Sequence, residues 1–362
     1  MKTLRVAVIG AGIVGASVAY RLCEGGARVI LLDAAEPASG TTSASFAWAN
    51  ANRKLPKSYF ELNVAGMREH HRLLRELGGD WLHGGGNLMW EEDVEGLERR
   101  VARLRSWGYP ARVMSASEVR ENLEPGVVLP DGAPVGFFPE EFWVDAPRLT
   151  DALVERARRG GAEVRPNAAV RSVEAGEGRL AALRLESGER LEADAAVNAA
   201  GPAAAAVAAM FGRRLPLEVF PGLLVRVAAG GEPLRRLLHT PLVNVRPDGS
   251  GRLLLHHDSV DARLAGDFGG LEDPLCGVLL ERARRVVPAL EGAEAVEARL
   301  GRRPVPGDGL SCVGAAPGVA GYYEAVTHSG VTLGPLLGRL LAREILAGEV
   351  DPLISPFRPD RF

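Results

Sequence analysis

Cysteine is scarce in this chain of 362 residues. Cys23, Cys276 and Cys312 are the three cysteines, and they lie far apart. Such isolated cysteines do not build a disulfide framework, and their spacing matches no zinc motif. We therefore expect a reducing, cytoplasmic location and no metal site.

No charge of one sign dominates either. The chain carries 43 Lys and Arg against 46 Asp and Glu, for a net charge of −3. Electrostatics therefore give no case for a nucleic-acid partner. Lysine itself is rare: it occurs only at Lys2, Lys54 and Lys57, so nearly all positive charge is carried by arginine.

Long apolar runs are also missing. The apolar run at Val6–Ile9 ends after a few residues at Gly10. This is too short for a signal-peptide core, and no stretch reaches the roughly 20 apolar residues of a membrane span. Because 46% of the residues are hydrophobic over this length, we expect two interleaved or tandem domains rather than one core.

What is present begins with a βαβ pattern. Residues 4–9 are short and apolar, which predicts a buried parallel strand, and residues 13–24 carry apolar side chains at helical spacing. Gly25-Gly26 stops this helix, and residues 27–32 predict a second strand that ends at Asp33. The whole unit spans about 30 residues, as βαβ units do.

The turn inside this unit reads GAGIVG, from Gly10 to Gly15. In such a GxGxxG turn, Gly10 permits the tight bend, Gly12 leaves room for a pyrophosphate, and Gly15 lets helix and strand pack closely. The helix N-terminus points its N–H groups at the phosphates, and Asp33 can bond ribose hydroxyls. These features together favour a dinucleotide site over a plain glycine-rich turn. The acid argues against NADP, but the motif alone does not separate NAD from FAD.

The remaining pattern mixes helices and strands. Residues 36–58 are polar, small and irregular, which is typical of a functional loop. A second small-residue turn, DAAVNAAGP at 194–202, can approach a nucleotide closely. We predict helices at 59–77, 94–107, 147–159, 274–287 and 332–347, and strands at 162–166, 168–174, 180–186, 194–198 and 322–327, with a strand-rich region at 217–258.

Several sequence motifs follow one another in an order that is typical of one protein family. The motifs are VAVIGAGIVGASVAYRL with Asp33, WVDAPRL at 143–149, NAAVRSVE at 167–174, AAVNAAGP at 195–202, GRRPVPGDGLSCVG at 301–314 and THSGVTLGPLLGRLL at 327–341. In this order they resemble the D-amino acid oxidase family of flavoproteins, in the branch that holds glycine oxidase and sarcosine oxidase. The resemblance covers nearly the whole chain and implies FAD as the cofactor.

The resemblance implies an α/β (α+β) fold, in which a Rossmann-like FAD-binding domain is interleaved with a substrate domain on a largely antiparallel sheet. We assign residues 1–50, 145–215 and 300–362 to the FAD-binding domain. Residues 51–144 and 216–299 then form the substrate-binding domain.

The resemblance also implies which residues hold FAD. The helix that begins near Leu333 would aim its N-terminus at the flavin. Cys312 falls in a strand after the GRRP motif, so we expect non-covalent binding. The implied FAD-binding residues are Gly10, Gly12, Ile13, Val14, Gly15, Asp33, Thr41, Thr42, Ser43, Ser45, Val170, Ala200, Gly201, Arg303, Ser329, Gly330, Val331 and Thr332.

Arg303 aligns with an arginine that pairs the substrate carboxylate in glycine oxidase. A guanidinium binds a carboxylate through two parallel hydrogen bonds and so fixes its orientation. For a single arginine among so many, the simpler interpretation is a solvated surface charge. The position in the GRRP motif favours Arg303, with Arg302 as the alternative register.

The substrate pocket departs from the family pattern. The oxygen-activating lysine of some relatives is absent from the matching stretch, since no lysine follows Lys57. The stretch that carries a substrate-binding tyrosine in glycine oxidase reads LVNVR at 242–246, and a usual glycine pair is replaced by His256-His257. The last motif is also two residues shorter after Gly330. The substrate therefore cannot be carried over from the family.

We predict that the substrate pocket is lined by residues of the functional loop at 36–58 and of the strand-rich region at 217–258. Only one of His256 and His257 can face it, because neighbours on a strand point to opposite faces. His70 and His71 lie on a charged helix and are expected to be solvated. The predicted catalytic residues are Arg303, His328 and His256, and the predicted substrate-binding residues are Arg303, Trp48, Asn50, Asn244 and Arg246.

The expected activity is that of an FAD-dependent amine oxidase. A glycine-like or N-substituted amino acid would be oxidised to an imine that hydrolyses, and O2 would be reduced to H2O2. Three alternatives stay open: a flavin dehydrogenase that uses a quinone or another acceptor, a 2-hydroxy acid oxidoreductase, and a non-catalytic dinucleotide-binding subunit. The sequence leaves a homo-oligomer open.

Overall fold

The computed structural model describes residues 3–130, 132–264 and 268–362. It confirms the predicted βαβ unit, with β1 at Arg5–Ile9, α1 at Ile13–Glu24 and β2 at Arg28–Leu32. The two strands pair in parallel and are almost fully buried. Within the described ranges, no helix is both long and apolar enough to cross a bilayer.

The unit forms the centre of a six-stranded sheet in the order β19-β20-β13-β1-β2-β9. All pairs are parallel except β19 with β20. The carboxyl ends of β1, β2 and β13 therefore meet at one edge, where open α/β sheets bind their ligands. The other strands of this sheet are β9 (Glu163–Arg165), β13 (Ala195–Asn198), β19 (Cys312–Ala315) and β20 (Tyr322–Val326).

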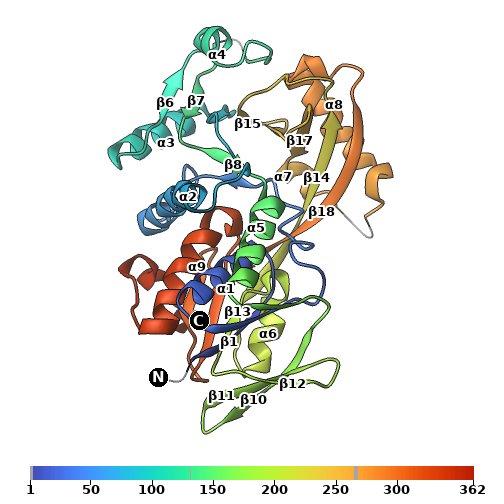
Figure 1. The fold of residues 1–362 in the computed structure, drawn as a ribbon. Helices are drawn as coiled ribbons and strands as arrows, with labels where there is room; N and C mark the ends of the chain where they lie inside the picture. The colour runs from blue at the N-terminus through green and yellow to red at the C-terminus, as the bar shows by residue number, and fades with distance from the viewer. Residues whose placement is uncertain (1–2, 131, 265–267) are drawn as a thin grey trace.

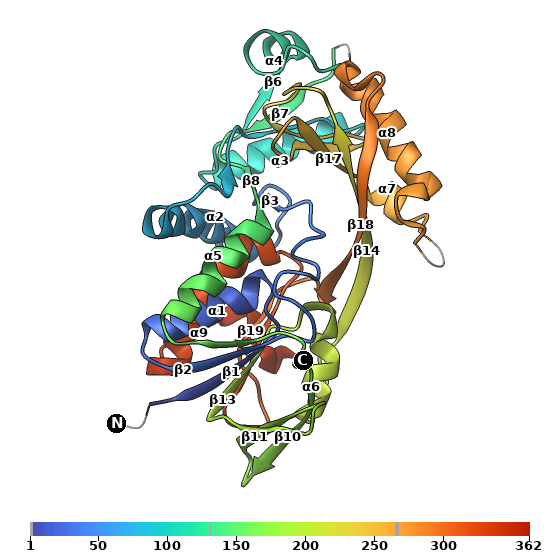
Figure 2. The same cartoon turned by 45° about the vertical axis from the view of Figure 1, so that its right-hand side comes forward.

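Both faces of this sheet are covered. α1, α5 (Ala146–Arg159) and α9 (Gly330–Ala347) lie on one face (Figures 1 and 2). α6 (Ala204–Met210) and a small sheet pack on the other face. The small sheet consists of β10 (Val170–Gly176), β11 (Arg179–Leu185) and β12 (Arg190–Glu192). The fold is thus the expected mixed α/β class with a Rossmann-type layer.

A second, eight-stranded sheet has the order β18-β14-β17-β16-β15-β5-β7-β6 and is antiparallel except for β15 with β5. α8 (Pro274–Val286) packs against it through apolar side chains. Its strands are β5 (Asn87–Met89), β6 (Arg112–Met114), β7 (Val135–Phe138), β14 (Leu217–Ala228), β15 (Leu237–His239), β16 (Asn244–Pro247), β17 (Arg252–His256) and β18 (Glu294–Pro306).

Two long strands join the halves of the molecule. β14 and β18 pair along their whole lengths, from Leu217 with Pro306 to Ala228 with Glu294. Figure 2 shows them running from the eight-stranded sheet down to the Rossmann-type layer. The domain boundary that we predicted at residue 300 falls inside β18. The chain therefore crosses between the two sheets along a continuous strand rather than through a linker.

The remaining elements are shorter or lie at the periphery. The predicted helices at 59–77 and 94–107 are α2 and α3, whereas α4 and α6 were not predicted. These two have only seven residues each, too few for a clear helical period in the sequence. The further elements are α2 (Lys57–Leu77), α3 (Val94–Ser106), α4 (Ala116–Asn122), α7 (Asp258–Asp261), β3 (Trp48–Ala49), β4 (Leu82–His83) and β8 (Phe142–Val144).

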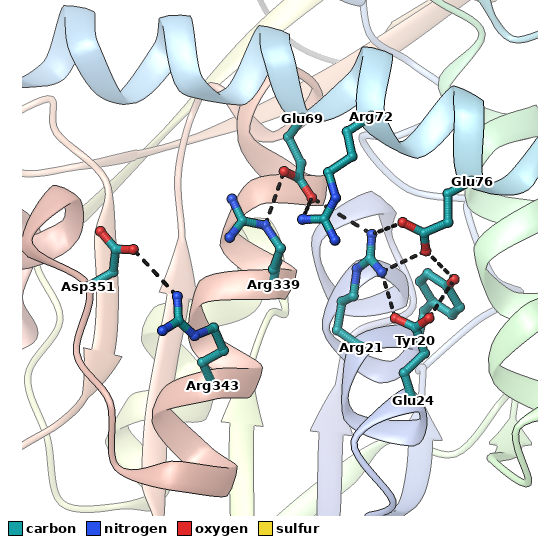
Figure 3. Close-up of polar contacts among 9 residues, drawn as sticks. All are labelled: Tyr20, Arg21, Glu24, Glu69, Arg72, Glu76, Arg339, Arg343 and Asp351. Carbon is teal, nitrogen blue, oxygen red and sulfur yellow. Dashed lines mark hydrogen bonds and ion pairs between the residues drawn. The ribbon is translucent and has the colours of Figure 1, made fainter.

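Helices α1, α2 and α9 are joined by a network of ion pairs (Figure 3). Arg21 of α1 is buried between Glu76 and Glu69 of α2, with its Nη1 2.6 Å from Glu76. Glu69 also contacts Arg339 of α9 at 3.0 Å. Because α1 and α9 both begin at the cavity described below, this network helps to fix the distance between their N-termini.

We expect Arg21→Met to lower the free energy of unfolding by about 2 kcal/mol, because it leaves the partly buried carboxylate of Glu76 without its ion-pair partner and removes one cation from buried Glu69. Urea denaturation followed by circular dichroism measures this change. Arg343→Met is the matched control, since Arg343 is half-exposed and its ion pairs, with Glu349 and Asp351, lie at the surface. Equal stabilities of the two variants would contradict the role given to Arg21.

Candidate cofactor and substrate site

A cavity of about 600 Å³ lies between the carboxyl edge of the Rossmann-type sheet and the eight-stranded sheet. One end is bordered by Gly10 and Asp33, and the other by His256, Arg303 and His328. Its length, its volume and its mixture of apolar and polar walls are those of a site for a large organic ligand.

The turn after β1 is shaped by its glycines. Gly10 has φ +103°, and a Cβ there would lie 2.4 Å from the carbonyl oxygen of Ala199. Gly12 is different, because a Cβ would meet only Thr42 Oγ1 at 3.1 Å and otherwise project toward the cavity. The first glycine is thus needed by the fold, whereas the second keeps the cavity open.

Asp33 is held at this turn by two backbone amides. Its Oδ2 accepts a hydrogen bond from Ala11 N at 2.6 Å, and its Oδ1 accepts one from Ala35 N at 2.9 Å. The carboxylate borders the cavity just beyond β2. This is the place expected for an acid that bonds the hydroxyls of a ribose.

The predicted functional loop follows the cavity wall. Thr42 Oγ1 accepts a hydrogen bond from Ile13 N at 3.1 Å, which ties the loop to the start of α1. Thr41 Oγ1 donates to the carbonyl oxygen of Arg302 at 2.7 Å, which ties it to β18. The loop is therefore fastened at both sides of the cavity although it has almost no regular structure.

The cavity also borders the N-terminus of α9. This helix begins at Gly330, and no side chain caps it. Ser329 precedes it and accepts hydrogen bonds from Lys54 Nζ at 2.8 Å and Tyr59 OH at 3.1 Å. α1 likewise begins without a side-chain cap. Two positive helix ends thus point at one cavity, which favours a ligand with negative charge at two places.

Arg303 lies on β18 at the other end of the cavity, paired with acids that we had not predicted. Its Nη1 is 3.3 Å from Asp258, and its Nη2 is 3.1 Å from Asp261. His256 Nε2 is 2.9 Å from the same Asp261. The sequence gave no sign that these aspartates lie beside His256. In the structure, His256, Asp258 and Asp261 come close enough together that they could ligate a metal ion. The guanidinium supplies the positive charge at these carboxylates.

The two neighbouring histidines diverge as expected for a strand. His256 borders the cavity. His257 points away, and its Nδ1 accepts a hydrogen bond from Ser259 N at the start of α7. The question that the sequence left open is therefore answered in favour of His256.

Trp48 forms part of the wall and rests on a buried acid. Its indole Nε1 donates to Glu141 at 3.0 Å, and its ring lies 3.8 Å from that of His239. Burial raises the pKa of Glu141 to about 7, although several donors oppose this shift. The sequence gave no signal for Glu141 or His239, because neither belongs to a motif.

Two histidines that line the cavity, His328 and His239, are buried away from water. Burial lowers the pKa of His328 to about 3, with Lys54 and Arg303 adding to the effect, and its Nδ1 has no hydrogen-bond partner among the described residues. Burial also lowers the pKa of His239 well below its usual range. Both rings are therefore neutral near pH 7 and act as polar contacts rather than as charges.

Most of the predicted site residues meet at this cavity, but some do not border it. Arg246 bonds Asp248 at 2.7 Å and lies over the ring of Trp143, so we remove it from the substrate-binding set. Gly15, Ser43 and Val170 are also absent from the lining. The predicted residues that line the cavity are Gly10, Gly12, Ile13, Val14, Asp33, Thr41, Thr42, Ser45, Trp48, Asn50, Ala200, Gly201, Asn244, His256, Arg303, His328, Ser329, Gly330, Val331 and Thr332.

The prediction that His70 is solvated is wrong. His70 is fully buried, and its Nε2 is 2.7 Å from the carbonyl oxygen of Val331 in the first turn of α9. Only His71 is exposed. Glu69 beside His70 is also buried, where it pairs with Arg21 and Arg339 (Figure 3), so this side of α2 packs against α1 and α9 although other charged residues of the helix are exposed.

Comparison with known proteins decides the family. A family model described as "DAO: FAD dependent oxidoreductase" matches residues 5–344. The chain belongs to this family. It is therefore an FAD-dependent oxidoreductase, as the motifs indicated.

Relatives in this family match over nearly their whole lengths. The chain is 28% identical to glycine oxidase of Bacillus licheniformis, over 98% of this chain and 96% of that protein. It is 27% identical to hydrogen cyanide synthase subunit HcnC of Pseudomonas aeruginosa, over 100% and 97%. The structure of glycine oxidase from Geobacillus kaustophilus superposes with a TM-score of 0.89 at 27% identity, over 99% of this chain and 100% of that one.

The residues present fit the cofactor of the family. The uncapped start of α1, the open space beside Gly12 and the carboxylate of Asp33 suit the pyrophosphate and ribose of FAD. The uncapped start of α9 at Gly330 suits the electron-rich edge of the flavin. The cavity joins these places without interruption.

Proposed function

We propose that this FAD-dependent oxidoreductase is an amine oxidase of the glycine oxidase type. Its substrate would be glycine, an N-substituted glycine or a D-amino acid, and the products an imine that hydrolyses to a 2-oxo acid and free amine. The observation that carries this proposal is Arg303, a cation on the wall of the same cavity that holds the FAD-binding residues.

Arg303 retains donors for a carboxylate. Of its five N–H groups, hydrogen bonds engage one on Nη1, with Asp258, and two on Nη2, with Asp261 and the carbonyl oxygen of Pro221. Two donors are left: the second N–H of Nη1, and the N–H of Nε, which has no hydrogen-bond partner among the described residues. A substrate carboxylate that binds there holds the neighbouring amine-bearing carbon at a fixed distance from the wall.

The other side chains shape the reaction space. When bound, FAD accepts the hydride of the carbon next to nitrogen and passes the electrons to an acceptor, which we propose is O2. The start of α9 stabilises negative charge at the cavity. The rings of Trp48 and His239 contact each other at a tilt of 34° and form part of the cavity wall. His328 and His256 contribute polar contacts at the substrate end.

We propose that the cofactor is bound without a covalent bond. All three cysteines are buried and free, and none borders the cavity. Cys312 Sγ donates to Glu324 Oε2 at 3.1 Å in the interior of the sheet. No thiol is thus placed to attack the flavin.

Anaerobic reduction of the flavin tests this function. The purified protein should be yellow, and its flavin absorbance should bleach when glycine, sarcosine, an N-carboxymethyl amine or a D-amino acid is added without oxygen. Admission of air should restore the colour with one H2O2 per amine oxidised.

The same experiment separates the alternatives. Bleaching by amines with slow recovery in air, but fast recovery with a quinone, would indicate a dehydrogenase. Bleaching by 2-hydroxy acids alone would indicate a different substrate class. No bleaching by any member of the panel would favour a non-catalytic subunit and overturn the proposal.

A further inference from the structure

Lys54 stands apart from the other basic residues of the site. It follows the functional loop, borders the cavity, and lies with its Nζ 2.8 Å from the hydroxyl of Ser329 at the start of α9. Among the described residues, this hydroxyl is its only hydrogen-bond partner, and no carboxylate forms an ion pair with it.

The neighbouring cations are all paired with acids. Arg53 forms an ion pair with Glu91, although it lines the same cavity. Arg303 contacts Asp258. On the surface of α2, Lys57 lies 3.6 Å from Glu61. Lys54 is therefore the basic side chain of the site that lacks a counter-ion within the described part of the chain.

The surroundings of Lys54 oppose its positive charge. Burial lowers the pKa of Lys54 to about 8, and Arg53 adds to this effect, while the more distant carboxyl of Glu141 opposes it. The ring of His328 is neutral and does not offset this effect. The face of the Tyr59 ring, 5.8 Å from Nζ, acts in the opposite direction and favours the ammonium form. The positive end of α9 lies next to Ser329 and acts in the same direction as Arg53. A large share of Lys54 is thus a neutral amine near pH 8.

The proposed reaction needs such a group. An amino acid or a secondary amine arrives in water mainly as an ammonium ion, and the carbon next to an ammonium cannot release hydride because nitrogen has no free electron pair. Removal of one proton must therefore precede oxidation. Lysine with a pKa lowered by burial is a known type of general base.

We propose that Lys54 is the general base that takes the ammonium proton of the bound substrate. The neutral ε-amine of Lys54 accepts the proton, so that the substrate becomes a free amine and Lys54 becomes an ammonium ion. No electrons are transferred in this step, and the total charge of the pair is unchanged. This inference rests on the proposed function, because it assigns a residue to the activation of an amine substrate.

The first test compares pH profiles of anaerobic flavin reduction, measured by stopped flow with the panel amine that reduces the wild type fastest. In the wild type, the rate should rise with pH through about 8 as Lys54 loses its proton. In Lys54→Met the rate at pH 7.5 should fall on the order of a hundredfold, and the rising limb should move up to the pKa of the substrate amine. Lys57→Met is the matched control and should keep the wild-type profile.

A substrate with a less basic amine separates a base from a structural role. N-(2,2,2-trifluoroethyl)glycine carries fluorines that lower the pKa of its nitrogen, so more of it is already neutral at pH 7.5. Lys54→Met should lose little activity on this substrate relative to wild type. An equal loss on both substrates at every pH would show that Lys54 only shapes the site, and would overturn the proposal.

A measurement without turnover gives an independent readout. Because the chain has only three lysines, protein labelled with [ε-¹³C]lysine should give three resolved NMR signals, assigned by single substitutions. The Lys54 signal should titrate near pH 8. Titration of Lys54 near the usual 10.5 would overturn the proposal even if Lys54→Met failed to fold.

The two proposals fail in different ways. If no amine bleaches the wild-type flavin, the proposed function is wrong and the role of Lys54 falls with it. If amines bleach the wild type and Lys54→Met with the same pH profile, only the role of Lys54 is wrong.

Discussion

Arg303→Met is expected to weaken the binding of carboxylate-bearing amines by about 3 kcal/mol, or roughly a hundredfold in Kd. The reason is that the substrate carboxylate loses the cation that should meet it at the cavity wall. The variant also leaves Asp258 and Asp261 near the carboxylate, and both repel it. The Kd is measured from the concentration dependence of anaerobic flavin reduction.

Two further variants make this prediction sharp. Arg302→Met is the matched control, because Arg302 is exposed and does not border the cavity. Asp258→Asn should strengthen carboxylate binding, because it removes the negative charge that competes with the substrate for Arg303. If Arg302→Met weakened substrate binding and Arg303→Met left the Kd unchanged, the arginine that binds the carboxylate would be Arg302 rather than Arg303.

Glu141→Leu is expected to destabilise the protein by about 4 kcal/mol. Glu141 is buried, and four side chains donate to its carboxyl at 2.9–3.1 Å: Trp48, Asn52, Asn87 and Tyr109. Leucine has a similar volume but accepts no hydrogen bond, so four donors would lose their partner in the interior. Chemical denaturation measures the loss.

The consequences should extend to the cavity. Trp48 should lose its fixed position on the wall, which tryptophan fluorescence can report, and substrate reduction of the flavin should slow. Glu140→Leu is the control, since Glu140 is exposed beside Glu141 in the sequence. A stability within 1 kcal/mol of wild type for Glu141→Leu would show that this cluster does not support the site.

The parts of the site that follow from neighbouring residues were predicted well. The turn from Gly10 to Gly15 was readable because its bend, its close contacts and the helix start are all set within a few residues. The same holds for α1, for β2 and for the start of α9, where apolar period and glycine signals lie together. Elements whose structure is set by neighbouring residues can be predicted without knowledge of the rest of the chain.

The parts that depend on long-range packing were missed. Lys54 and Ser329 are 275 residues apart, and Trp48 and Glu141 are 93 apart, yet each pair is in hydrogen-bond contact. No pattern in the sequence connects such positions. Arg246 was predicted from its position in the stretch at 242–246, but that position did not reveal that its side chain pairs with Asp248 and does not border the cavity.

The placement of the cavity also has a consequence for how the enzyme is made. Its walls come from four stretches of the chain, at 10–54, 199–202, 222–258 and 301–332. A nascent chain that has emerged only to residue 300 carries the glycine turn but neither Arg303 nor α9. The complete cofactor site therefore forms only after the chain has been made at least as far as the start of α9, long after the glycine turn at its other end.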